Sequence, residues 1–452
     1  MNGLWRLVVL MMLASLTAYA GGPLLVGGPF DAPGVAFKWD TSAPIPYRTD
    51  LGTLGTLNKA AADQLTDDMF LVWENVPTAT ISFTNAGNLA QDVTGANFFA
   101  LDSNLNSDIN TSNAIIYDTD GSVTDEVFGT GASDDVLGFA GPLAIASDGI
   151  NNFYTIARAV LNGKFIDGQP SPEVALAKFQ EAFIHEFGHF SGLEHSQINV
   201  EALIPAQRTA DNLAGLPTMF PFLLGSAAPR LTLSPDDIAT ISELYPTAGF
   251  QSSTGRIQGR IFFSDGATPV QALNVIARQV DDPLTPEDES RRVAVSSVSG
   301  FLFTASAGNS VVAGSADSFG SRDGTLIGFY DMPGLAPGSY TVEVEAIDPE
   351  FIDASSVGPL GFLLFQFPIP GTCALEFLNQ APPESDTDAC GDKGPLVVAP
   401  GAVLNTGTDI ILNGTQPTFD AWESARLWLP SLPNAHQGGA ARESLVAMGL
   451  AA

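Results

Sequence analysis

Near the middle of the chain, three side chains have the types and spacing of a metal site with an acid–base group beside it. His185 and His189 stand four residues apart. On a helix this spacing places both imidazoles on one face, one turn apart, where their nitrogens can share an ion. Glu186 follows the first histidine and can point toward the same cavity, where it could accept a proton from a bound water molecule. The pattern therefore predicts a zinc ion with a carboxylate base next to it.

A third histidine completes the longer pattern H-E-x-x-H-x-x-G-x-x-H. Gly192 can adopt left-handed backbone geometry, so the chain can leave the helix there and turn back. His195 then supplies a third nitrogen, and the fourth position of the metal stays open, which is typical of catalytic zinc. The five fixed positions arise by chance on the order of once in 10^4 chains. Three of the chain's four histidines belong to this motif, which favours a metal site over three unrelated histidines.

This motif resembles the zinc signature of the metzincin clan of metalloproteases. Ser196, which follows the third histidine, is similar to the residue at that place in the matrixin subgroup. The stretch 216–221 resembles the methionine turn of the clan, with Met219 as the residue that packs beneath the metal. Residues 233–239 resemble the last helix of the matrixin domain, so the likeness covers about residues 37–248.

The resemblance implies an endopeptidase that hydrolyses peptide bonds in a protein or peptide substrate. It implies Zn2+ as the cofactor, with Glu186 as the catalytic base and three metal ligands: His185, His189 and His195. Two features depart from the matrixin pattern. Phe220 stands where matrixins usually have tyrosine, and no cysteine precedes the motif to keep the enzyme latent. The alternative is a surface adhesion or binding protein whose metzincin-like domain is inactive, although the intact Glu186 argues against it.

The elements that must position these residues follow from hydrophobic spacing and capping signals. Helices are predicted from Leu57 to Val72, from Ser171 through the first two histidines to Gly192, and from Ser234 to Pro246. Strands are predicted at residues 37–39, 45–47, 80–83, 113–117 and 136–145. Pro142 makes the last of these an edge strand. Together they predict an α+β domain at residues 21–248.

After Gly249 the helical spacing gives way to short alternating segments separated by turns, which predicts an all-β sandwich at residues 252–414. The stretch 326–340, with the opening strand at 255–261, resembles carboxypeptidase-regulatory-like or prealbumin-like modules. That resemblance implies a spacer, stability or binding role. Cys373 and Cys390 most simply form one disulfide in an exported protein, and a pair of free thiols is the alternative. The tail 415–452 is expected to be weakly structured.

The ends and the charge of the chain indicate where it works. Residues 1–20 have the basic start, apolar run and small-x-small pattern of a signal peptide, so a secreted protein is expected. The alternative is an uncleaved anchor, but the apolar run is short for a membrane span. The chain has 18 Lys and Arg against 50 Asp and Glu, a formal charge of -32. This charge argues against nucleic acid and anionic membrane surfaces as partners.

A second metal is considered at an acidic turn around Gly121. Asp118, Asp120 and Asp125 surround this turn and partly resemble a calcium loop. The spacing of a full calcium loop, with its glutamate at position 12, is not met. Ca2+ is therefore a possible second cofactor, and a solvated acidic turn is the alternative.

Overall fold

The structure is a computed structural model of the chain. It describes residues 21–28, 30–224, 227–271, 273–303, 320–321, 323–347, 376–379 and 393–412. The predicted signal peptide, the predicted Cys373–Cys390 disulfide and the tail lie outside the described residues.

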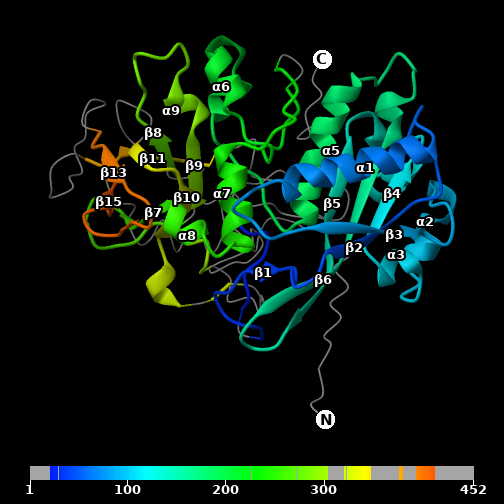
Figure 1. Ribbon diagram of the computed structural model, residues 1–452, viewed down its shortest axis with the longest axis horizontal. Helices are drawn as coiled ribbons and strands as arrows, with labels where there is room; N and C mark the ends of the chain where they lie inside the picture. The colour runs from blue at the N-terminus through cyan, green and yellow to red at the C-terminus, as the bar shows by residue number, and fades with distance from the viewer. Residues whose placement is uncertain are drawn as a thin grey trace, which may run out of the picture.

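The first half of the chain is built on a six-stranded mixed sheet, shown at the right of Figure 1. Its strands are β1 (Phe37–Lys38), β2 (Ile45–Thr49), β3 (Phe83–Asn88), β4 (Ala114–Asp118), β5 (Gly138–Ser147) and β6 (Asn152–Asn162). Five strands run parallel in the order β1-β6-β4-β2-β3. Strand β5 pairs antiparallel with β6. Within the described part of the chain β6 is the only partner of β5, which confirms the predicted edge strand.

For this sheet, one sequence prediction is wrong and one strand was missed. The strand expected to begin at Thr80 begins at Phe83 instead. The backbone N–H of Thr80 donates to the carbonyl of Tyr245, 2.7 Å away, so this residue is bound to the end of a helix rather than to the sheet. Strand β6 was not predicted. Its last six residues are all buried, so it lacks the alternation of a half-buried strand.

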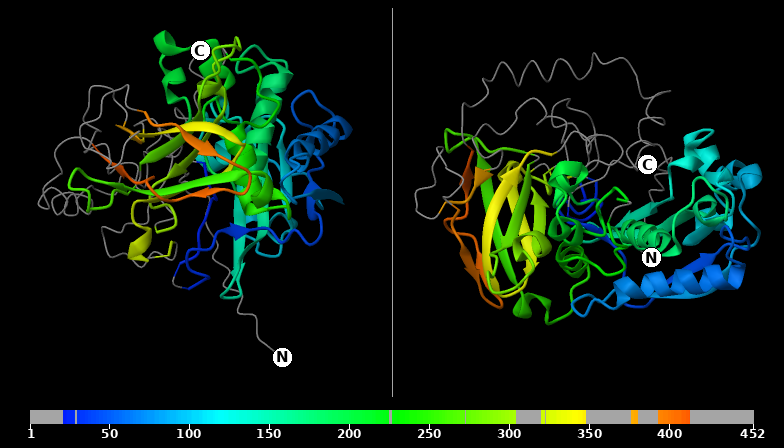
Figure 2. Two further views of the ribbon diagram at one scale, coloured as in Figure 1. Left: turned by 60° about the vertical axis from the view of Figure 1, so that its left-hand side comes forward. Right: turned by 90° about the horizontal axis from the view of Figure 1, so that it is seen from above.

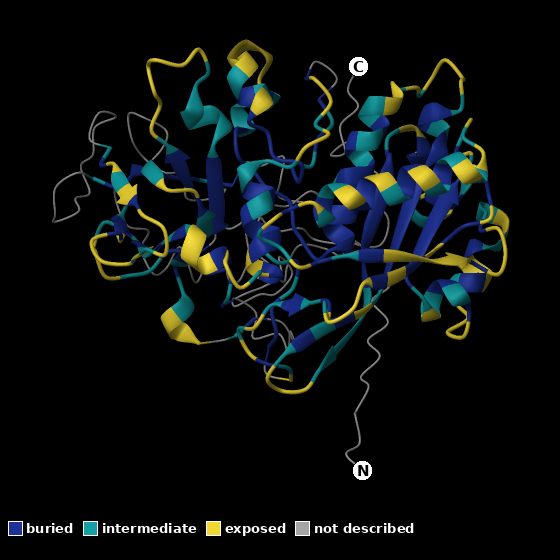
Figure 3. Ribbon diagram, viewed as in Figure 1, coloured by how far each residue is buried: buried dark blue, intermediate teal, exposed yellow. Residues whose placement is uncertain are grey.

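The first half contains seven described α-helices: α1 (Lys59–Glu74), α2 (Gly95–Asp102), α3 (Asp108–Thr111), α4 (Ser122–Phe128), α5 (Leu176–Phe190), α6 (Ala210–Ala214) and α7 (Pro235–Leu244). Helices α6 and α7 lie on the side of the β-rich second half, where α7 contacts β9 (Ala294–Val298) and β10 (Phe329–Leu335) (Figure 1). Helix α1 exposes its outward face and buries its inward face against the strands (Figure 3). Helix α7 begins as predicted, because the Ser234 side chain accepts from the backbone N–H of Asp237 and caps it.

Helix α5, which carries two of the three histidines, begins later than predicted. The capping signal at Ser171 favoured a start there, but residues up to Ala175 are not helical, and the first helical residue is Leu176. The N–H of Val174 donates to the carbonyl of Phe165, 2.9 Å away, which holds this segment outside the helix. The end of the helix is as predicted, since Gly192 has a φ of +92° just beyond it.

The apolar face of α5 fixes how the helix is rotated. Four phenylalanines on it are fully buried: Phe179, Phe183, Phe187 and Phe190. The ring of Phe187 stacks on that of Phe70 in α1, with centroids 3.8 Å apart. Two indoles donate to α5 carbonyls, Trp73 to Ile184 at 2.9 Å and Trp39 to Phe190 at 2.8 Å. With this face buried, the histidines on the other side of the helix face away from the aromatic core.

The second half, which we call the β module, is a sandwich of two sheets. It contains helices α8 (Phe250–Ser253) and α9 (Glu289–Arg292) and the following strands: β7 (Gly255–Phe262), β8 (Asn274–Gln279), β9 (Ala294–Val298), β10 (Phe329–Leu335), β11 (Gly338–Glu345), β12 (Glu376–Phe377), β13 (Leu396–Val398), β14 (Val403–Leu404) and β15 (Ile410–Ile411). One sheet has β7 beside β10, β14 and β15, and the other has the order β12-β11-β8-β9, with β13 on β11. Figure 2 shows the module to one side of the helices and the six-stranded sheet. Side chains of both sheets share one apolar core, as the alternating pattern predicted.

A buried carboxylate lies where the β module meets the first half. Glu345, at the end of β11, accepts from the side chains of Gln197 at 2.6 Å and Asn274 at 2.8 Å. Burial raises the pKa of Glu345 to about 7, and the charge of Glu343 acts in the same direction. The two hydrogen bonds and the charge of Arg278 oppose this rise. The carboxyl of Glu345 therefore tends to keep its proton in the folded protein near neutral pH.

Glu345→Gln should change how stability depends on pH. Between about pH 4.5 and pH 7 the folded protein retains a proton that the unfolded chain has lost. The contribution of this group to stability is therefore complete below pH 4.5 and is lost as the pH rises toward 7. As the pH rises through this interval, the wild type should lose up to about 3 kcal/mol of unfolding free energy that the variant does not lose. Urea denaturation at several pH values measures it, and a difference that does not change with pH would contradict the assignment.

Candidate metal centre

Three imidazoles from two segments meet at one point. The Nε2 atom of His195 lies 3.2 Å from Nε2 of His185 and 3.0 Å from Nε2 of His189. Zinc–nitrogen bonds of about 2.0–2.1 Å in a tetrahedral site separate two ligand nitrogens by about 3.3 Å, so the observed spacing fits such an ion. Within the described ranges, these residues form the one cluster of His, Cys, Asp or Glu side chains that could hold a metal.

Backbone carbonyls set the tautomer of the two helical histidines. The Nδ1 of His185 donates to the carbonyl of Thr218 at 2.8 Å, and the Nδ1 of His189 donates to the carbonyl of Leu193 at 2.9 Å. A carbonyl can only accept, so the proton of each neutral ring sits on Nδ1 and the Nε2 lone pair is left for a metal. Both lone pairs then point at the ring of His195, an arrangement that a bound cation would stabilise.

Burial keeps these two histidines neutral. It lowers the pKa of His189 to about 4, partly offset by the hydrogen bond to Leu193. It also lowers the pKa of His185 well below its usual value, and the charges of His189 and Arg230 add to this effect. Metal binding requires neutral imidazole, so neither ring must lose a proton at neutral pH before it can act as a ligand.

Glu186, the residue after His185, lies against the edge strand β5. Its side chain is 7% exposed, and a Cβ on Gly138 would lie 3.1 Å from its Cγ. Burial raises the pKa of Glu186 to about 8, while a hydrogen bond from the backbone of Ala140 lowers it. A carboxyl with a pKa near neutrality can accept and release a proton within one reaction cycle.

Met219 lies beneath the helix that carries the first two histidines. It is 2% exposed, and a Cβ added at Gly188 would overlap its Sδ atom. Its turn is held by Asp237 of α7, whose carboxylate accepts from the N–H groups of Thr218 at 2.7 Å and Met219 at 3.1 Å. Asp237 therefore positions the carbonyl that orients His185. The capping signal at Ser234 identified this aspartate only as part of a helix start.

Gly188→Ala should destabilise the protein and weaken metal binding. The added methyl would overlap Met219 Sδ, in the turn whose Thr218 carbonyl orients His185, and would lie 2.9 Å from Trp73 Cζ2. Overpacking of this kind costs about 1–3 kcal/mol. Urea denaturation of the metal-free protein measures the loss, and adding Met219→Ala to the variant should recover part of it. A Gly188→Ala variant as stable as wild type would show that the turn can move aside without cost.

The N-terminal segment supports the loop that carries the third histidine. The N–H of Gly21 donates to the carbonyl of His195, and the N–H of Leu24 donates to the carbonyl of Gly192, both at 2.8 Å. The backbone N–H of Glu194 donates to the carbonyl of Gly22 at 3.1 Å. The loop 192–195 is thus held like a short strand by a segment more than 160 residues away in the sequence. No sequence signal pointed to this contact.

The acidic turn considered for calcium caps backbone groups. Both carboxylate oxygens of Asp118 accept N–H hydrogen bonds, from Val123 at 3.0 Å and from Thr124 at 2.8 Å, at the start of α4. Asp125 accepts from the N–H groups of Gly131 and Ser133. Asp120 accepts from the N–H of Ser122 at 3.1 Å. A calcium ion would have to share these oxygens with N–H donors, and calcium binding stays a prediction.

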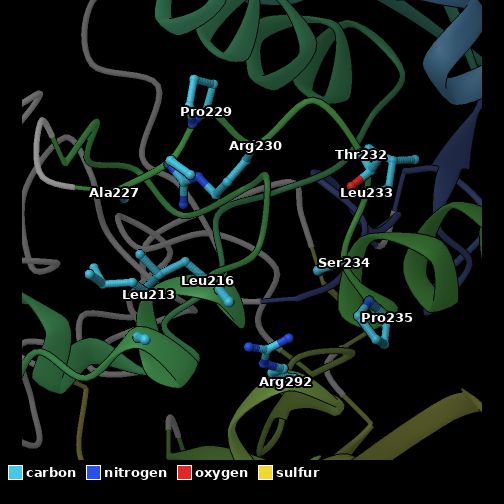
Figure 4. A pocket seen from close by; sticks show the side chains of 13 residues that line it. Leu213, Leu216, Ala227, Pro229, Arg230, Thr232, Leu233, Ser234, Pro235 and Arg292 are labelled. Atoms are coloured by element: carbon cyan, nitrogen blue, oxygen red, sulfur yellow. The ribbon is translucent and has the colours of Figure 1, made fainter. Parts of the chain in front are cut away.

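A cavity of about 470 Å³ lies beside the methionine turn, between helix α6 and the β module (Figure 4). Its lining is mostly apolar, with Leu213, Leu216 and Leu233, and includes Arg230 and Arg292. Arg230 is fully engaged, since it pairs with Glu181 and donates to the carbonyl of Pro217 at 2.8 Å. No histidine of the metal cluster lines this cavity, so it is separate from the metal centre.

Comparison with known proteins adds no assignment. No family model matches the chain, and no curated protein matches it. Among the helices described, none combines the length and the apolarity needed to cross a membrane. The structure shows a mixed α/β protein with a histidine triad that could hold a metal ion.

Proposed function

We propose that this chain is a secreted zinc-dependent endopeptidase, similar to the matrixins of the metzincin clan. One observation carries the proposal: the Nε2 atoms of His185 and His189 lie 3.2 Å and 3.0 Å from the Nε2 atom of His195, and the residue after His185 is the buried Glu186. Three nitrogen ligands leave one position for water or substrate, which distinguishes a catalytic from a structural zinc site. A zinc ion bound there supplies a Lewis acid that activates water and polarises the scissile carbonyl.

Glu186 performs the proton transfers. Its carboxylate accepts a proton from the attacking water and later delivers it to the nitrogen of the departing amine. The surroundings of the carboxyl suit both steps, because burial raises its pKa to about 8 and the backbone of Ala140 provides a hydrogen bond that orients it. The charge of a bound cation would shift the balance toward the ionised form that accepts the proton.

Strand β5 is the proposed binding edge for the substrate. It pairs with β6 on one side, and its first residues lie against Glu186. An extended peptide added to an edge strand gains main-chain hydrogen bonds without regard to sequence, and side-chain pockets then give specificity. A peptide laid along residues 138–144 would carry its scissile bond past the carboxyl of Glu186.

The proposal includes export and a protein or peptide partner. The signal-like residues 1–20 and the net charge of -32 support a protein that works outside the cell and does not bind nucleic acid. An adhesion protein with an inactive domain would share the export signal and the histidines. It would differ in showing no turnover.

Incubation of the purified full chain with a peptide library, followed by mass spectrometry, tests the proposal. We expect cleavage that a zinc chelator abolishes and that added Zn2+ restores. Cleavage that persists in the chelator would indicate a contaminating protease or another mechanism. Zinc binding without any cleavage would favour the adhesion protein.

A further inference from the structure

The four residues that follow the third histidine are all buried against the β module or the helix that joins it. Ser196, Gln197, Ile198 and Asn199 are each at most 1% exposed. Three of the four are polar, and buried polar side chains require hydrogen-bond partners. Their hydrogen-bond partners lie in α6, α7, α9 and β8 and at the end of β11, and they differ for each residue.

Ser196 is tied to the module through one carboxylate. Its side chain bonds to Asp236 of α7, which also accepts from the backbone N–H of Ser296 in β9 at 2.6 Å. Asp236 is 1% exposed. The residue next to the metal ligand is therefore joined to the second half of the chain by a buried bridge.

Gln197 and Ile198 contact the same five-stranded sheet, which contains β8, β9 and β11. The Nε2 of Gln197 donates to Glu345 at 2.6 Å and to the carbonyl of Ala346 at 3.0 Å, at the end of β11. Ile198 forms a separate apolar cluster with Ile276 of β8 and Ala294 of β9. Backbone movement of this segment would break polar and apolar contacts together.

Asn199 ends the contact in a left-handed turn. Its φ of +62° makes it the one non-glycine residue with positive φ in the described part of the chain. Its side chain accepts from Arg278 at 2.8 Å and donates to the carbonyl of Arg291 at 2.8 Å. Arg278 is itself paired with Glu343 of β11. Together with a hydrogen bond of 3.1 Å to the carbonyl of Asn212 in α6, the module thus supplies the bonds that offset an unfavourable backbone conformation.

We propose that the β module is a positioning element of the metal centre, and that its strands β8, β9 and β11 fix His195 through residues 196–199. The inference rests on metal binding by the histidine triad, as proposed above. Ligands held in place before the metal arrives lose less conformational entropy on binding, so loosening the support of one ligand lowers affinity. The β module then has a direct effect on chemistry, in contrast to a spacer.

Ile198→Ala in the full chain tests this inference. It removes the apolar contact with Ile276 and Ala294 while it leaves every metal ligand and hydrogen bond in place. We expect zinc affinity, measured by competition with a chromophoric chelator, to fall about tenfold. The visible absorption of the Co2+-loaded protein should change, because the geometry around the ion changes. Ile198→Val should retain most of the affinity.

Ile257→Ala is the matched control. Ile257 lies in β7 of the opposite sheet, is 0% exposed and belongs to the module's own core. The control should lose stability to urea and bind zinc as wild type does. Wild-type affinity and an unchanged Co2+ spectrum in Ile198→Ala would overturn the inference, as would an equal loss of affinity in the control. A wild-type chain that binds no metal would instead refute the proposed function itself.

Discussion

Glu186→Gln is expected to abolish peptide hydrolysis while zinc stays bound. The amide has the shape of the carboxyl but cannot accept a proton, and general-base catalysis contributes about 10²–10⁴-fold to such reactions. We expect kcat/KM to fall by at least this factor and zinc content to stay at the wild-type level, because Glu186 is not one of the clustered ligands. Turnover of a fluorogenic peptide and metal analysis of the same sample measure both quantities.

The matched control for this substitution is Glu173→Gln. Glu173 is exposed and accepts a weak hydrogen bond from the N–H of Gly168 at 3.2 Å, outside the metal centre. The Glu173→Gln variant should hydrolyse the peptide at the wild-type rate. If Glu186→Gln cleaved peptides at the wild-type rate, the assigned base would be wrong even though the metal site could stand.

His195→Ala is expected to remove zinc binding and activity together. Two histidines on one helix face remain, but the third nitrogen that lies 3.0–3.2 Å from them is gone. Zinc at 100 times its dissociation constant should stabilise the wild-type fold by about 2.7 kcal/mol, and the same concentration should leave the variant unchanged. Thermal unfolding with and without zinc measures this difference.

His436→Ala is the control for the second prediction. His436 is the one histidine of the chain outside the motif, and it lies beyond the described residues. The variant should behave as wild type in both assays. Equal zinc stabilisation of the wild type and His195→Ala would show that the metal binds elsewhere.

The cluster of ligands was predictable because its information is local. Spacing on one helix and a glycine that reverses the chain bring His185, His189 and His195 together, and the structure has them in contact. Strand β4 and the capped start of α7 were predictable for the same reason, since a short apolar run and a capping signal are properties of a few consecutive residues.

The support of the site was not predictable, because it comes from distant segments. Asp237 binds the turn that orients His185, and the N-terminal segment binds the loop of His195. Neither the residue types nor their spacing in the sequence indicates these contacts. Strand β6 was missed because burial on both faces removes the alternating pattern. The late start of α5 was missed because a tertiary hydrogen bond at Val174 overrides a capping signal.

The contrast between nearby ligands and remote supports has a consequence for how the protein folds. The ligands span eleven residues, so even an unfolded chain can present all three to a metal. Their final arrangement requires contacts between residues 21–24, 192–199 and 274–346, which are far apart along the chain. Contacts between residues far apart in the sequence form slowly, because the chain must first lose the entropy of closing the loop between them. Zinc added early in refolding would therefore meet a flexible chelating peptide, and the mature site would form only after the two halves of the chain have docked.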